Sequence, residues 1–244
     1  MKRLFVAWAC VLCWIPAFCV DAANNTFPLK KADPSQPITI PDDLSERAAS
    51  LAKQMMEKPT VQARGPIDTF TCTPEQYYWL LDNPDRAVIA WRRLGAKCVS
   101  IQKRGPQKFG YMDESGSDVT WETIHQAPGV RVWFAEGKVK ASSVLPLVPV
   151  KALVILRSAE AKSIDGVVTV QHHAEVLIHT DSKAAATITK MMGNSAPKLA
   201  EQGLGQLQLF FSALSFYVDR HPDQVDKLFQ PEKDQAPQVL PKKR

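Results

Sequence analysis

Two titratable side chains stand out because each lies on an otherwise apolar face of an expected strand. His172 alternates along the chain with Val170, Ala174 and Val176, so period-two geometry gives it the same face as these aliphatic residues. By the same rule, Glu136 shares a face with Val130, Val132 and Phe134. Buried polar groups need partners. His172 and Glu136 are therefore core groups satisfied by neighbours, polar anchors inside a ligand cavity, or an acid–base pair.

The residues around these two groups do not indicate an enzyme or a metal site. No nucleophile or metal-ligand set accompanies them, so we predict no catalytic residues. His172 and His173 point to opposite faces of a strand, and His173 and His179 are about 20 Å apart along it. Neither CxxC nor HExxH occurs beyond residue 22. We expect no metal and no cofactor.

An apolar stripe runs along the expected helix that follows Pro197 and ends near Arg220. Its largest members are Leu207, Phe210, Phe211, Leu214, Tyr217 and Val218. A helix with so broad a stripe is buried or faces a cavity. Core packing and a lipid-sized pocket are both consistent with it. The residues expected to line such a pocket are Trp121, Phe134, Glu136, His172, Phe210, Leu214 and Tyr217.

Capping signals and turn residues position these side chains. After a strand at 67–72, Thr73-Pro74-Glu75-Gln76 forms a capping box, and Asn83-Pro84-Asp85 begins a second short helix that stops at Gly95. Six strands follow at about 97–103, 107–113, 117–125, 129–139, 148–159 and 166–180. A helix at 182–192 and the long helix complete the order.

The N-terminal segment of the sequence indicates export. Lys2 and Arg3 precede an uncharged run from Leu4 to Val20, and Ala22 offers a small residue for cleavage, which is the order of a secretory signal peptide. We expect a signal peptide at 1–22, a mobile leader with one amphipathic helix at 23–65, a domain at 66–229 and a disordered tail at 230–244. No stable membrane span is expected after cleavage, and the protein would be periplasmic or extracellular.

Composition excludes one class of partner and suggests one covalent bond. The net charge is only +5 and the basic residues are scattered, so no nucleic-acid partner is expected. Of the five cysteines, Cys72 and Cys98 are the two that remain after cleavage. In an oxidising compartment such a pair predicts a disulfide, with two separate thiols as the alternative.

The order of the elements, with the Thr73–Gln76 and Asn83–Asp85 signals, resembles the START/Bet v 1-like helix-grip superfamily over roughly 66–220. The resemblance implies an α+β fold, with a curved antiparallel seven-stranded sheet gripping a long C-terminal helix and two short helices after the first strand. It also implies that the first two strands are antiparallel neighbours, which would bring Cys72 near Cys98. A cystatin- or NTF2-like cone is the alternative fold.

Two functions remain open from the sequence. The first is an exported, bacterial, non-enzymatic binder of an apolar small molecule or lipid in the cell envelope, which the resemblance and the aromatic-rich faces favour. The second is a secreted structural or protein-interaction module whose core is filled by its own side chains. An enzyme of the cyclase or hydrolase kind is a third possibility. The sequence does not determine the oligomeric state.

Overall fold

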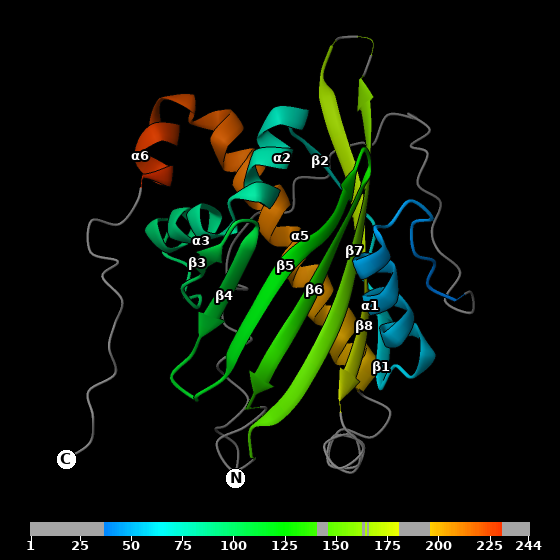
Figure 1. The fold of residues 1–244 in the computed structure, drawn as a ribbon. Coiled ribbons are helices and arrows are strands. Elements are labelled where there is room, and N and C mark those ends of the chain that lie inside the picture. The colour runs from blue at the N-terminus through cyan, green and yellow to red at the C-terminus, as the bar shows by residue number, and fades with distance from the viewer. Residues whose placement is uncertain (1–36, 141–145, 163, 165, 181–195, 231–244) are drawn as a thin grey trace, which may run out of the picture.

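The computed structural model describes residues 37–140, 146–162, 164, 166–180 and 196–230 (Figure 1). The expected signal peptide, the helix expected at 182–192 and nearly all of the expected tail lie outside these residues. The helices are α1 (Glu46–Glu57), α2 (Pro74–Asp82), α3 (Pro84–Arg93), α5 (Ala196–Arg220) and α6 (Val225–Phe229). The strands are β1 (Val61–Arg64), β2 (Asp68–Thr71), β3 (Gln102–Gly105), β4 (Lys108–Met112), β5 (Asp118–Ala127), β6 (Val130–Val139), β7 (Val148–Lys162) and β8 (Val168–Thr180).

The helical corner forms where the capping signals predict it. The Thr73 side chain accepts a hydrogen bond from the Gln76 amide at 3.2 Å, and Pro74 occupies the first turn of α2. Asn83 acts differently from the expected N-cap, because its Nδ2 donates back to the carbonyl of Trp79 at 2.9 Å. Gly95 follows α3 with φ +91°, which a glycine adopts without strain.

Among the described residues, eight strands form one antiparallel sheet in the order β1-β8-β7-β6-β5-β4-β3, with β2 also paired to β8. The α+β fold with a curved antiparallel sheet and a long C-terminal helix is confirmed. The strand in excess of the expected seven is β1, which Gly65 and Pro66 separate from β2. Because Pro66 donates no hydrogen bond, the edge strand is interrupted there.

Helices cover both faces of the sheet. We define the inner face as the one toward α5, which packs along β1, β2 and β8, and the outer face as the one toward α1 (Figure 1). Inner-face Val170, Ala174 and Val176 of β8 share one apolar cluster with Leu204, Phe211 and Leu214 of α5. Outer-face Val132, Phe134, Leu153 and Ile155 form a second cluster with Ile38, Ala52 and Met55. The sheet therefore lies between two apolar clusters.

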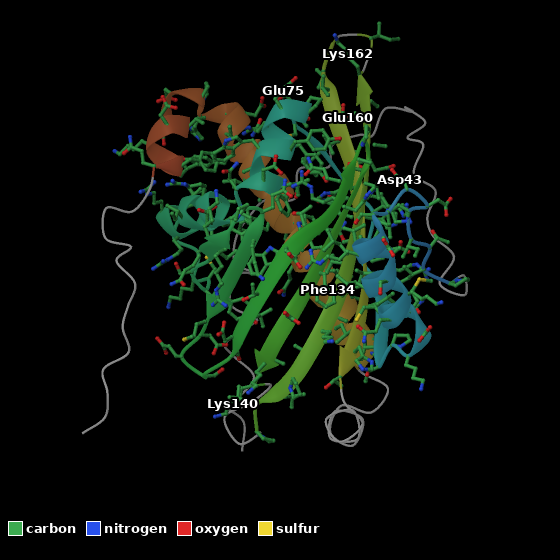
Figure 2. The ribbon with its side chains drawn as sticks, in the orientation of Figure 1. Asp43, Glu75, Phe134, Lys140, Glu160 and Lys162 are labelled. Carbon is green, nitrogen blue, oxygen red and sulfur yellow. The ribbon has the colours of Figure 1, made fainter. Side chains whose placement is uncertain are left out.

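Polar contacts tie the segment before α1 to the outer face. Glu175 is 4% exposed and lies 2.7 Å from Nε of Arg64 and 3.4 Å from Nε of Arg157. Arg157 also donates to the carbonyl of Thr39 at 2.6 Å. Asp43, nearer α1, lies 3.4 Å from the His125 ring (Figure 2). The described residues of the expected leader are thus packed against the sheet.

Candidate functional site

Cross-strand register determines which side chains share the inner face. Ile178 lies opposite Ala152, Ala152 opposite Ala135, and Ala135 opposite Trp121. Directly opposed residues of antiparallel strands project on the same side. Ile178 and Ala152 pack against the cluster beneath α5, so the whole row belongs to the inner face. Trp133, two residues before Ala135, faces the same way.

The inner face is not completely buried over its central strands. Trp121, Trp133, Ala135 and Ala152 all remain partly accessible, and we call these four residues the open inner face. On the opposite face of β6 and β7, Val132 and Leu153 are both 0% exposed. Ala135 and Ala152 carry small side chains, and the main contacts of α5 with the sheet are with β1, β2 and β8. At these central positions, the inner face therefore keeps accessible apolar surface that Val132 and Leu153 do not leave on the outer face.

A polar cluster lies beside the open inner face, beneath α2 and α5. The hydroxyl of Tyr77 lies 3.0 Å from Nδ1 of His172, and both side chains are 0% exposed. Aromatic edges enclose the imidazole, with Phe70 at 5.1 Å and Phe211 at 6.2 Å between ring centroids. Nε2 of His172 lies 4.0 Å from Oδ2 of Asp68 on β2.

Burial disfavours the charged forms of His172 and Tyr77. Desolvation lowers the pKa of His172 to about 4, with a smaller contribution from His173. Desolvation also raises the pKa of the Tyr77 hydroxyl well above its ordinary value. In a neutral ring whose Nδ1 accepts the hydroxyl proton, Nε2 carries the hydrogen and faces Asp68. At neutral pH the cluster therefore supplies neither a phenolate nor an imidazolium.

The sequence prediction misplaced two residues of the expected site. Phe134 and Glu136 face outward, toward the side that α1 covers. Phe134 is 6% exposed within the cluster under α1, whereas Glu136 is exposed to solvent. An acid–base pair of Glu136 and His172, one of the three alternatives that the sequence left open, is excluded because the sheet separates the two side chains. Apolar alternation indicated a buried face on β6 but did not distinguish between two buried faces.

The remaining expected residues lie at different distances from the open inner face. Trp121 is part of it, and Leu214 is buried in the cluster that surrounds His172. Phe210 stacks on Trp91 of α3 at 5.1 Å between ring centroids. The hydroxyl of Tyr217 instead donates to Gln224 at 2.8 Å, beyond the end of α5. The structure therefore groups Trp121, His172 and Leu214 on the inner side.

Tyr77, Trp133, Ala135 and Ala152 all belong to the site but were not expected from the sequence. The hydroxyl of Tyr77 contacts His172. The position of Tyr77 one turn after the Thr73 cap predicts that it lies on a helix, but does not indicate that its hydroxyl pairs with His172. Trp133 and Ala135 occupy the alternate positions of β6, opposite in parity to Phe134. The large aromatic ring of Trp133 within a strand was the signal that could have placed an apolar face there.

The two cysteines are separate thiols. Cys72 is buried and its Sγ donates to the carbonyl of Thr73, while Cys98 is exposed. The expected disulfide rested on the first two strands being neighbours. Instead, β2 pairs with β8 and β3 pairs with β4, toward opposite edges of the sheet. Burial raises the pKa of the Cys72 thiol to about 11.

Within the described ranges, no group of three or more His, Cys, Asp or Glu side chains is arranged to hold a metal ion. None of the described helices has the length and hydropathy needed to cross a membrane.

The sequence matches no protein-family model and no curated protein. Among solved structures, the chain is similar to a conserved protein from Geobacillus kaustophilus, with 16% identity, a TM-score of 0.41, and coverage of 66% of this chain and 96% of that chain. Norcoclaurine synthase from Thalictrum flavum gives 9% identity and a TM-score of 0.35, over 75% of this chain and 99% of that chain. The di-domain ARO/CYC BexL from the BE-7585A biosynthetic pathway gives 14% identity and a TM-score of 0.32, over 77% of this chain and 55% of that chain. All three TM-scores are below 0.5, so the fold assignment depends on the strand order and helix positions described above.

Proposed function

We propose that this chain is an exported, non-enzymatic binder of an apolar small molecule or lipid. The ligand lies against the open inner face, where Trp121 and Trp133 supply aromatic surface and Ala135 and Ala152 supply room. The observation that carries the proposal is the contrast between the two faces of the sheet. On the outer face Val132 and Leu153 are fully buried, whereas Trp121, Trp133, Ala135 and Ala152 of the inner face keep accessible apolar surface.

The polar cluster supports binding rather than catalysis. His172 and Tyr77 are neutral at pH 7 and inaccessible, and the one partly exposed member is Asp68, whose side chain is 29% exposed. A general base must reach the proton that it abstracts. A fixed imidazole–hydroxyl pair instead gives the wall of the cavity a definite shape and polarity.

Tryptophan fluorescence tests the proposal directly. A brominated fatty acid quenches tryptophans that its chain contacts, so titration into residues 23–244 should quench part of the emission. The double variant W121F/W133F should lose that quenching. W79F should retain it, because Trp79 is 41% exposed on α2 and packs against Phe229. Quenching that is absent, or unchanged in the double variant, would contradict a ligand site at the open inner face.

Protein purified after export tests both the cleavage of the signal peptide and the presence of a bound ligand. The exported protein should begin near Ala23 on N-terminal sequencing, and solvent extraction followed by mass spectrometry should release an apolar compound. Material that begins at Met1 would contradict cleavage of the expected signal peptide.

The alternative, a protein-interaction module, is favoured by one observation. Leu209 and Phe216 of α5 are 63% and 54% exposed, which is high for large apolar side chains. For this function, the purified protein would contain no extractable ligand, and polar substitutions at these two positions would alter association rather than ligand binding.

A further inference from the structure

One arginine at the edge of the open inner face is buried with an incomplete set of partners. Arg131 of β6 lies opposite Leu156, a member of the cluster beneath α5, and is 3% exposed. Its Nη1 lies 2.7 Å from Oδ1 of Asp82, whose side chain is 49% exposed. Nη1 and Nη2 are both buried, and neither makes a hydrogen bond among the described residues, Nη1 being held only by its ion pair with Asp82.

The guanidinium is adjacent to the proposed ligand surface. Its Cζ lies 5.9 Å from the centroid of the Trp133 ring, and Trp133 belongs to the open inner face. The polar end of a molecule lying against Trp133 would therefore lie beside the guanidinium, and its binding would have to open Nη2 to the ligand. The indole and the guanidinium together offer an apolar surface that ends in a cation.

The chemistry of this arrangement selects one kind of polar end. A buried guanidinium with a single half-exposed partner is costly, because desolvation is only partly offset. Its planar fork of N–H donors matches a carboxylate, which accepts two hydrogen bonds in the same plane. We propose that the ligand is a long-chain monocarboxylic acid whose carboxylate binds Arg131. This inference rests on the proposed function and names the ligand class for that site.

Asp82 limits the charge of the ligand. One carboxylate already lies against Nη1, and it offsets part of the attraction of the guanidinium for a second anion. This arrangement suits a singly charged head rather than a phosphate monoester, which carries more than one charge at neutral pH. It also predicts competition, because Asp82 and the ligand head approach the same cation.

Two ligands of equal chain length separate the inference from the proposed function. Dodecanoic acid and 1-dodecanol would each be titrated into residues 23–244, with tryptophan fluorescence as the readout. The wild type should bind the acid about tenfold or more tightly than the alcohol, as a charge-assisted hydrogen bond in a buried site provides. R131M should bind both equally, with its affinity for the alcohol unchanged. R47M is the matched control and should keep the preference, because Arg47 is 69% exposed on the outer side.

D82N provides a second test that does not require removing a buried charge. Freeing Nη1 should raise the affinity for the acid severalfold and leave the alcohol unaffected, so the inference can be tested even if R131M fails to fold. Equal affinities in the wild type, or a preference that survives in R131M, would overturn the carboxylate assignment while the binder function stands. Tighter binding of dodecyl phosphate than of dodecanoic acid would overturn it in favour of a phosphate head. Failure of every probe to bind would overturn the proposed function and the inference together.

Discussion

Replacing Ala135 by leucine tests whether the inner face has room. Ala135 is partly accessible at the centre of the open inner face, between Trp121 and Ala152 on the neighbouring strands. Leucine adds three carbons. In a filled core, such overpacking costs about 1–3 kcal/mol. If the site is open, the added carbons are only partly buried, and at about 0.8 kcal/mol per buried methylene the variant would instead be more stable than the wild type by roughly 1 kcal/mol.

The free energy of unfolding in urea measures this difference, and ligand titration accompanies it. We expect A135L to be as stable as the wild type or more so, and to bind a brominated fatty acid more weakly because its side chain occupies the site. The same substitution at Ala52 is the control. Ala52 is 0% exposed in the cluster under α1, so A52L should lose about 1–3 kcal/mol and keep its ligand affinity. A loss for A135L equal to that for A52L would show that the inner face is filled, and would refute the reasoning.

Three further predictions concern packing, pH and thiol reactivity. A Cβ at Gly65 would lie 2.1 Å from Oε1 of the Gln208 side chain, so the free energy of unfolding of G65A in urea should be lower than that of the wild type by roughly 1–3 kcal/mol. A Cβ at Gly203 meets nothing within 4 Å, so G203A should be as stable as the wild type or more stable by up to about 1 kcal/mol. The pKa of His172 falls from 6.5 to about 4 on folding, so the free energy of unfolding should be unaffected by this group above pH 6.5 and should decrease by roughly 3 kcal/mol as the pH falls toward 4. The variant H172Q should lack this decrease. An unchanged stability–pH curve in H172Q would contradict the burial of a neutral ring. Alkylation of the folded protein should modify Cys98 quickly and Cys72 only after unfolding, and finding the two joined in non-reduced mass spectrometry would contradict the strand order.

The sequence was sufficient where local signals determine the structure. Thr73 and Pro74 predicted where α2 begins, and Gly95 predicted where α3 ends, because caps depend on a few neighbouring residues. The five strands from β4 to β8 also lie where turn residues separated them, whereas β3 (Gln102–Gly105) begins five residues later than the strand expected at 97–103. Val61–Arg64 was placed in the leader because four residues before a Gly-Pro break carry too little pattern to indicate a strand.

The site was harder to predict because it depends on which element covers which face. Val132 and Phe134 alternate as buried residues should, but α1 covers them instead of α5. His172 was correctly placed beneath α5, since most of its face is aliphatic. Its partner Tyr77 lies 95 positions away, and Arg131 meets Asp82 through the α2–α3 corner. No local pattern encodes such distant contacts.

The position of β1 and β2 against β8 has a consequence for the order of folding. Strands β3 to β8 pair successively with their neighbours in the chain, whereas Arg64 and Glu175 meet across 111 positions. Closing so long a loop costs more chain entropy than closing a hairpin, so we expect the β3–β8 meander to form first and the β1–β2 edge, with α5 packed along it, to form last. The same edge should be the first to open under native conditions, which amide hydrogen exchange at Gly65 would show as faster than exchange at Trp133. Since the open inner face belongs to the early meander and α5 to the late edge, we expect the open inner face to stay folded while that edge opens.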